Sequence, residues 1–161
     1  MRNDLPEGIQ PVTPEIIDHL GVNIRPEHLR EINAMLPLAG DFALRWSVRT
    51  ASVCYAGVRD GTPLFVFGVG QPSPLTGSAM AWMLGSSAMN DHGIWIAEVS
   101  RAMLPILHQE SGARRIENWI PADYRVACKW LDWLGFTIGP PQMVINDVPH
   151  VHVFHDAEVS A

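Results

Sequence analysis

The sequence predicts an α/β protein with a mixed β-sheet flanked by helices, and two patterns indicate it. Apolar residues follow helical spacing to about residue 50, and apolar, β-prone runs replace them at 53–58 and 63–69. From residue 79 onward, strand, helix, strand and helix alternate, which is typical of a crossover between parallel strands. The 161 residues suffice for a single domain, so we expect one domain over 1–161 with its core at about 9–155.

Three helices are predicted in the first third of the chain, after a short edge strand at residues 8–12. Thr13 can cap the first helix, which Gly21 ends. A second helix begins at Pro26 and should stop at Pro37, because proline cannot continue a helix. Asp41 is the expected cap of a third helix that contains Phe42 and Trp46.

The remaining elements follow from turn residues and apolar runs. Asp60-Gly61 between two apolar runs predicts a hairpin, and residues 79–85 form a strand apolar enough to be covered on both faces. A helix over about 94–108, opened by Asp91, precedes a strand at 116–120, and these two strands should be parallel. The next helix, capped by Asp123, carries Trp130 and Trp133 toward the core. Runs at 143–145 and 151–154 form a closing hairpin.

Composition excludes two classes of partner. The net charge of −6 argues against a nucleic-acid binder, because phosphate neutralisation requires surplus Lys and Arg. No apolar run is long enough for a membrane span, and the N-terminus lacks the apolar core of a signal peptide, so we expect a cytoplasmic origin. Cys54 and Cys128 lie in apolar patterns and are expected to be buried free thiols.

Motifs in the second half of the chain resemble a known fold. Residues 118–120 read Asn-Trp-Ile, and residues 130–136 read Trp-Leu-Asp-Trp-Leu-Gly-Phe. This pairing resembles the GNAT (Gcn5-related N-acetyltransferase) fold, whose penultimate strand and following helix end in Leu-Gly-Phe. Residues 67–69 (Phe-Gly-Val) and 82–85 (Trp-Met-Leu-Gly) make the chain more similar to a tailed-phage branch, the internal virion protein family with an acetyltransferase-like fold. The resemblance covers about residues 40–155.

The resemblance implies where acetyl-CoA would bind in an active member. It places the cofactor at the loop after the third apolar strand and at the start of the next helix, where backbone N–H groups attract the pyrophosphate. The corresponding residues are Leu84, Gly85, Ser86, Ser87 and Gly93. The loop over 85–93 lacks the family's arginine and glycine pair, however, which favours a protein without a cofactor.

The catalytic positions also depart from the family pattern. The usual general-acid tyrosine falls on Leu131, which cannot give a proton, and Tyr124 lies two turns earlier. Glu117 and Asn118 lie on the strand that flanks the amine acceptor in active members, and Glu117 could be a base. The alternative for Glu117 is an ion pair with Arg114 or Arg115.

Two functions therefore remain open. The first is a bacteriophage virion-associated or morphogenesis protein that has lost acetyltransferase activity. It would act in the virion or host cytoplasm and bind phage structural proteins or itself. The alternative is an acetyl-CoA-dependent N-acyltransferase that modifies a host or phage amine by direct transfer, with Glu117 as the base. Exposed histidines near the C-terminus are expected rather than a metal site at His150, His152 and His155.

Overall fold

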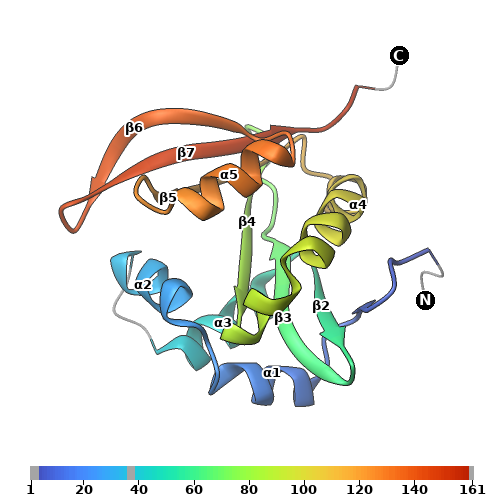
Figure 1. Cartoon of the computed structure of the whole chain (residues 1–161). Coiled ribbons are helices and arrows are strands. Elements are labelled where there is room, and N and C mark those ends of the chain that lie inside the picture. Colours follow the sequence, from blue (N-terminus) through green and yellow to red (C-terminus); the bar gives the residue numbers. More distant parts are fainter. Residues whose placement is uncertain (1–3, 36–38, 160–161) are drawn as a thin grey trace.

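The computed structural model describes residues 4–35 and 39–159, so the predicted helix end at Pro37 lies outside the described residues. Seven strands, five α-helices and one 3₁₀ helix are assigned within these residues (Figure 1). In chain order they are β1 (Ile9–Gln10), α1 (Pro14–Gly21), α2 (Pro26–Met35), α3 (Gly40–Thr50), β2 (Val53–Arg59), β3 (Thr62–Val69), β4 (Ser78–Gly85), η1 (Ser87–His92), α4 (Gly93–Ser111), β5 (Arg115–Pro121), α5 (Arg125–Trp133), β6 (Thr137–Ile145) and β7 (Val148–Asp156).

The strands form one mixed sheet in the order β1-β2-β3-β4-β5-β7-β6, and this confirms the predicted fold class. Among the strands of the described residues, β4 and β5 are the one parallel pair of neighbours, as the strand-helix-strand pattern predicts. Their pairing is short, because only Ser78–Met80 lie opposite residues of β5, namely Arg115, Ile116 and Glu117. Beyond that point β4 runs away from the group formed by β5, β6 and β7, which crosses the top of the view in Figure 1. The sheet therefore opens between its two halves.

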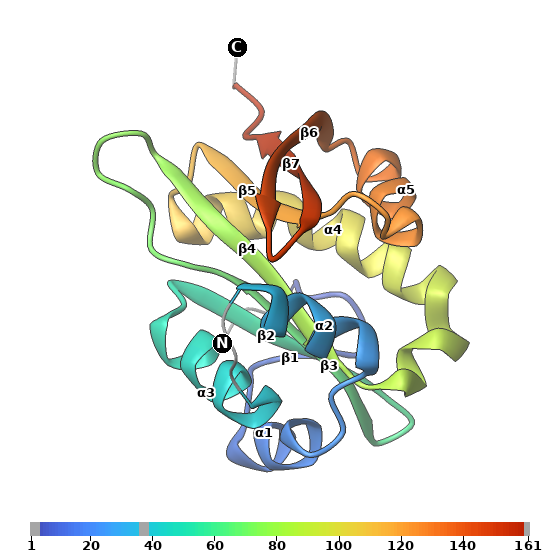
Figure 2. The same cartoon turned by 90° about the vertical axis from the view of Figure 1, so that its left-hand side faces the viewer.

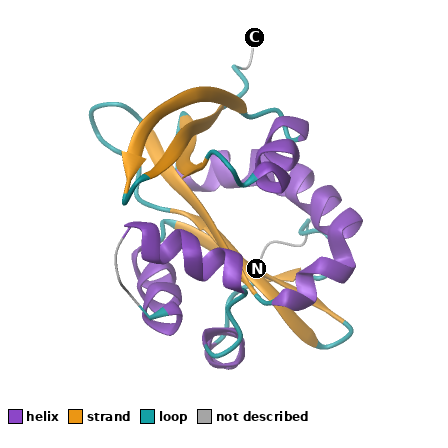
Figure 3. Cartoon of the chain, turned by 60° about the vertical axis from the view of Figure 1, so that its left-hand side comes forward, coloured by secondary structure: helices purple, strands orange, loops and turns teal. Residues whose placement is uncertain are grey.

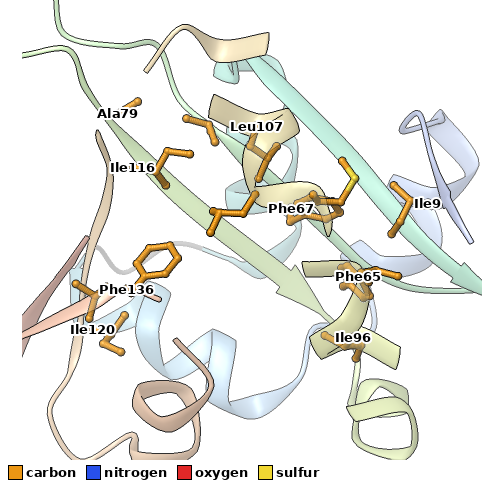
Figure 4. Close-up of a cluster of buried hydrophobic side chains, with 14 of the residues drawn as sticks. Ile9, Phe65, Phe67, Ala79, Ile96, Leu107, Ile116, Ile120 and Phe136 are labelled. Carbon is orange, nitrogen blue, oxygen red and sulfur yellow. The ribbon is translucent and has the colours of Figure 1, made fainter. Parts of the chain in front are cut away.

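Helices cover the two faces of the sheet and create two hydrophobic cores. The larger core lies under α4 and α5 and includes Phe65, Met103 and Ile116 (Figure 4). The smaller core lies under α1, α2 and α3 and includes Leu20 and Leu44, both fully buried. Figure 2 and Figure 3 show α1, α2 and α3 on the opposite side of β4 from α4. The sheet is thus the middle of three layers.

Both predicted hairpins are confirmed, and their turn residues explain them. Asp60 and Gly61 have φ angles of 48° and 75°, and Asn146 and Asp147 have φ angles of 47° and 63°. Two successive residues with positive φ match the twist of the flanking strands. Glycine, asparagine and aspartate tolerate this conformation better than other residues.

The predicted helix caps Asp41, Asp91 and Asp123 are wrong. Helices α3, α4 and α5 start at other residues, and no side chain caps their first turns. Asp41 instead pairs with Arg45 one turn along α3, and Asp123 accepts a hydrogen bond from Arg30 of α2. The predicted loop before α4 is also mostly helical, because η1 occupies it and leads directly into α4.

The exposure of several aromatic and histidine side chains differs from the prediction. Trp133 is 47% exposed, and the Cζ atom of Arg101 lies 3.5 Å from the centre of its ring. His150 is buried at 1% exposure, and Nδ1 of His155 lies 2.9 Å from Nε2 of His108. The histidines are therefore structural parts of β7 rather than an exposed tail. Within the described residues, no group of three or more potential ligands could hold a metal ion.

Candidate functional site

A cavity of about 520 Å³ lies where β4 and β5 separate. Its walls come from β4, β5, most of the length of α4, much of α5 and the side of α2, with further residues from β3, η1 and β7. Most of the lining is apolar, and the polar side chains include Glu31, Asn118 and Tyr124. A ligand-sized, mostly apolar hollow with a few convergent polar groups is the usual form of a small-molecule site.

Asn118 lies at the point of separation and connects the two strands. Its Nδ2 atom donates a hydrogen bond to the carbonyl oxygen of Ala81 over 2.8 Å. Its Oδ1 atom accepts one from the backbone N–H of Trp119 over 2.7 Å. The amide thereby satisfies a strand carbonyl that lies beyond the last backbone pairing between β4 and β5.

Alternation along β5 places Glu117 away from the cavity. Ile116, Asn118 and Ile120 line the cavity, whereas Glu117 is not among its lining residues. The Oε2 atom of Glu117 lies 2.7 Å from Nε2 of His152, whose ring stacks on Trp119. The predicted ion pair of Glu117 with an arginine is wrong.

The neighbouring arginines have other partners. Arg115 binds both carboxylate oxygens of Asp156, and Arg114 donates to the carbonyl of Thr76. The hydrogen bond to Arg115 lowers the pKa of Asp156 below its ordinary value. These pairs attach the start of β5 to β7 and to the loop before β4.

The loop over 85–93, which the sequence predicts as the cofactor site, is held in place by contacts with other segments of the chain. Leu84 is buried in the smaller core. The N–H of Gly85 donates to Nδ1 of His28 over 3.0 Å, and the N–H of Ser86 donates to the carbonyl of Leu64 over 3.0 Å. A β-carbon at Gly85 would lie 2.5 Å from that same carbonyl oxygen, so the backbone approach requires glycine.

The other two expected cofactor residues are more accessible. Ser87 is exposed at the start of η1. Gly93 begins α4 and lines the cavity, and a β-carbon there would meet no atom within 4 Å. Of the five residues, Gly93 alone contributes to the cavity wall.

A second cavity of about 210 Å³ lies beside the first, and Glu31 and Tyr124 line both; this pair of residues is called the junction below. Nη2 of Arg25 donates a hydrogen bond to the phenol oxygen of Tyr124 over 2.9 Å. Glu27 and Arg30 also line the second cavity. Two carboxylates, two guanidinium groups and a phenol are thus gathered around this junction.

Burial changes the acidity of three groups near the junction. It raises the pKa of Glu31 to about 7, against the opposing effect of the Arg25 and Arg30 charges. It also raises the pKa of Tyr124, which Arg25 partly counteracts. Burial lowers the pKa of His28 to about 4, so His28 is neutral at pH 7 and its Nδ1 atom can accept the Gly85 hydrogen bond.

One buried donor in the cavity wall has no partner. The Nε1 atom of Trp130 is buried, and no hydrogen-bond acceptor reaches it from residues 4–35 or 39–159. Leu131, where the family tyrosine was expected, lies beside it and also lines the cavity. A buried N–H without an acceptor is costly, so the described fold leaves this hydrogen-bonding group unused.

Comparison with solved structures identifies the architecture. An N-acetyltransferase from Staphylococcus aureus Mu50 superposes with a TM-score of 0.63 at 12% identity, covering 92% of this chain and 96% of that one. The yncA protein of Salmonella typhimurium, described as an acetyltransferase and solved with its cofactor acetyl-CoA, superposes with a TM-score of 0.62 at 12% identity, covering 96% and 97%. A spermidine N-acetyltransferase chimera from Vibrio cholerae and hSSAT superposes with a TM-score of 0.62 at 8% identity, covering 92% of this chain and 95% of that one.

The chain has the GNAT acetyltransferase fold. The sequence itself matches no protein-family model and no curated protein. At 8–12% identity, the three structures establish this GNAT fold and not an activity. The similarity to the phage branch of the fold stays a prediction. Within residues 4–35 and 39–159, no helix is both long and apolar enough to cross a membrane.

Sequence reasoning missed the contribution of α2 to the site. Arg25 and Tyr124 lie 99 positions apart, and the sequence contains no local signal that brings them together. The sequence did show Tyr124 near the start of α5, two turns before Leu131, where the family tyrosine was expected. Glu31 could not be distinguished from any other exposed helix glutamate, because only the tertiary packing of α2 buries it.

Proposed function

We propose that the protein is an N-acyltransferase that moves an acyl group from an acyl-CoA thioester to a primary amine. The observation that supports this most directly is the cavity between β4 and β5, which shares Glu31 and Tyr124 as lining residues with a second cavity. Two substrates could approach one another from opposite sides of that junction. The GNAT fold, and a structural neighbour solved with acetyl-CoA, agree with the proposal.

The residues fit the thioester arm of such a donor better than its phosphate end. The apolar cavity suits a flexible arm with amide groups, and Nε1 of Trp130 would donate to one of their carbonyls. The amides of Gly85 and Ser86 already have acceptors, and no Lys or Arg occurs between residues 85 and 93. The phosphate end would therefore rely on the exposed amides around Ser87 and the open side of Gly93.

Bound acyl-CoA supplies an activated carbonyl, and residues at the junction supply the proton transfers. Glu31, with a pKa of about 7, can take a proton from the ammonium form of the acceptor near neutral pH and release it to solvent, and can then take the second proton after the nitrogen has attacked the carbonyl. Tyr124 can give its proton to the leaving sulfur, since Arg25 donates to the phenol oxygen and does not use that proton. Asn118 keeps β4 and β5 in register at the reaction centre.

Glu117 is a second candidate for the base. It lies outside the cavity wall but is bonded to His152, which could relay a proton. We place the base at Glu31 because that carboxyl lines both cavities and has a pKa suited to proton transfer at pH 7. Asn118 is assigned a positioning role, because its amide cannot exchange protons near neutral pH.

The virion role that the sequence suggests also stays a prediction. The bound amides of Gly85 and Ser86 are compatible with lost cofactor binding. That role and the enzyme differ in one measurable property, which is the affinity for acyl-CoA. A protein that has lost the activity would show no such affinity.

Calorimetry with acetyl-CoA and with free coenzyme A tests the proposal first. We expect micromolar binding, followed by release of free thiol when a primary alkylamine is added. Glu31→Gln and Glu117→Gln are compared, since the proposal requires a large rate loss only for Glu31→Gln. Absence of binding for every acyl-CoA at millimolar concentration would overturn the proposal and leave the non-enzymatic role.

A further inference from the structure

Both backbone groups of Gly85 are held by one short segment, residues 24–28, where α2 begins. The N–H of Arg25 donates to the carbonyl oxygen of Gly85 over 2.8 Å, and the N–H of Gly85 donates to Nδ1 of His28 over 3.0 Å. An isolated antiparallel bridge lies at the same place. The start of α2 is therefore attached to the end of β4.

The same segment also contacts Tyr124 through a side chain. Nη2 of Arg25 donates to the phenol oxygen of Tyr124 over 2.9 Å, and its Nε atom donates to Glu27 over 3.1 Å. The Arg25 side chain is only 13% exposed, so these two contacts account for most of its surroundings. Arg25 thus binds Gly85 with its backbone and Tyr124 with its guanidinium group.

His28 is a permanent acceptor in this arrangement. Its side chain is buried, and burial lowers its pKa to about 4, so the ring stays neutral at pH 7. Arg25, His28 and Glu31 follow one another at spacings of three residues, and all three line the larger cavity. The bond from Gly85 to His28 therefore fixes the rotation of α2 about its axis, and with it the direction in which Arg25 and Glu31 face the cavity.

We propose that His28 is a positioning residue, which holds Arg25 and thereby Tyr124 in place for proton transfer to the leaving sulfur. This inference rests on the proposed N-acyltransferase function and adds a residue to its site. The amine nitrogen bonds to the thioester carbon, and the carbon–sulfur bond breaks with its electron pair on sulfur. The sulfur takes the Tyr124 proton, which solvent then replaces. His28 itself is a poor base at pH 7, because its Nδ1 atom already accepts the Gly85 N–H.

Loss of the His28 acceptor should lower kcat through Tyr124. In His28→Leu the Gly85 N–H loses its acceptor, so the start of α2 can shift and move the Arg25 guanidinium away from the phenol. Misplacement by about 1 Å can cost on the order of a hundredfold in rate, so we expect kcat to fall by about ten- to a hundredfold. His28→Asn retains an acceptor and should recover most of this loss.

A double-mutant cycle tests whether His28 acts through Tyr124. Steady-state thiol release with acetyl-CoA and a primary alkylamine is measured for wild type, His28→Leu, Tyr124→Phe and the double variant. If both residues serve one step, the double variant should be no slower than Tyr124→Phe alone. Thermal melting checks that each variant is folded. Arg25→Met keeps the His28–Gly85 bond and removes the contact with the phenol, so it should reproduce the rate loss even if His28→Leu does not fold.

Tyr124 can also be observed without turnover. The chain contains two tyrosines, so isotopic labelling of tyrosine Cζ gives two NMR signals, and Tyr55→Phe assigns them. Burial raises the pKa of Tyr124, and the Arg25 charge partly counteracts this. His28→Leu and Arg25→Met should therefore raise the phenol pKa further, whereas His28→Asn should leave it near that of wild type. The other charged groups near the phenol remain in all these variants, and they are Glu27, Arg30 and Glu31.

The outcomes separate this inference from the function on which it rests. Wild-type kcat in both His28→Leu and Arg25→Met, or additive losses in the double variant, would overturn the positioning role and keep the transferase. A changed Tyr124 pKa in His28→Leu, with wild type that binds no acyl-CoA, would keep the link between the two residues and remove the function. An unchanged Tyr124 pKa in a folded His28→Leu would overturn that link whatever the activity.

Discussion

The side chain of Asn118 donates a hydrogen bond to the carbonyl oxygen of Ala81, 2.8 Å away, where β4 and β5 separate. Backbone pairing between the two strands ends at Met80 and Glu117, one residue earlier on each strand. A side-chain amide therefore continues a backbone ladder that the opening of the sheet interrupts. This lets the cavity form without leaving the Ala81 carbonyl unpaired.

Replacement of Asn118 by alanine should destabilise the fold and disturb the site together. The Ala81 carbonyl would lose its donor, and a partly buried acceptor without a partner costs about 1–3 kcal/mol. Urea unfolding of Asn118→Ala measures this cost. Asn118→Asp is the matched control, since aspartate has a similar shape but no donor, and it should lose as much stability. A fully stable Asn118→Asp would show that the hydrogen bond contributes little.

Glu31→Gln should abolish the acidic limb of the pH–rate profile. Burial raises the pKa of Glu31 to about 7, so activity that needs its carboxylate should rise as pH increases toward about 7 and then level off. The glutamine variant should lose about two to four orders of magnitude in kcat and show a flat profile over this range. Steady-state thiol release from pH 5.5 to 8.5 provides the measurement. An unchanged acidic limb in the variant would assign the base elsewhere, with Glu117 the next residue to test.

Tyr124→Phe should lower kcat and leave acyl-CoA affinity nearly unchanged. The phenol is proposed to protonate the leaving sulfur, which matters only during reaction, while phenylalanine retains the ring that lines both cavities. Dissociation constants from calorimetry and kcat from thiol release separate the two effects. Equal losses in affinity and rate would indicate a binding role for Tyr124. Leu131→Phe, at a position without a proton to give, serves as the control for changes in ring packing.

Elements that depend on neighbouring residues could be predicted from the sequence. Asp60 and Gly61 specify the first hairpin because their own backbone preferences fix the turn. The parallel pairing of β4 and β5 follows from the length and apolarity of the segments between them. Thr13 caps α1 as expected, because its side chain accepts the N–H of Ile16 in the same turn.

Features of the site that depend on distant packing could not be predicted. The raised pKa of Glu31 results from burial by segments remote in sequence. The position of Glu31 in the sequence of α2 does not indicate this burial. Asp123 lies where the sequence predicts a helix cap, yet its carboxylate accepts a hydrogen bond from Arg30 of α2 instead. The two histidines His108 and His155 meet because α4 packs against the end of β7, an arrangement that exists only in the folded chain.

The stability of the protein should depend on two titrations of opposite sign. Burial lowers the folded-state pKa of His28 from 6.5 to about 4, so the unfolded chain binds more protons between these values and stability falls as pH decreases through them. Burial raises the folded-state pKa of Glu31 from 4.5 to about 7, so the folded chain binds more protons there and stability falls as pH increases from 4.5 to 7. The two effects oppose one another over most of this range.

Single variants should reveal each titration. His28→Asn keeps an acceptor for the Gly85 N–H but does not titrate, so its stability relative to wild type should improve as pH falls from 6.5 to 4, by on the order of 2–3 kcal/mol. Glu31→Gln should gain relative stability as pH rises from 4.5 to 7. Urea unfolding at half-unit pH steps yields both difference curves. Curves parallel to wild type would show that neither group is buried as described.

Trp130→Phe should weaken acyl-CoA binding without a matching loss of stability. The buried Nε1 atom of Trp130 has no acceptor within the described residues, so the unliganded fold gains nothing from this N–H. A ligand carbonyl would complete the hydrogen bond, worth about 0.5–1.5 kcal/mol or roughly two- to tenfold in affinity. Trp133→Phe is the matched control three residues later, because Trp133 is half-exposed and stacks with Arg101. The control should lose about 0.5–1 kcal/mol of stability through that contact and keep its affinity. Equal affinities for wild type and Trp130→Phe would mean that no ligand carbonyl reaches the cavity wall at Trp130.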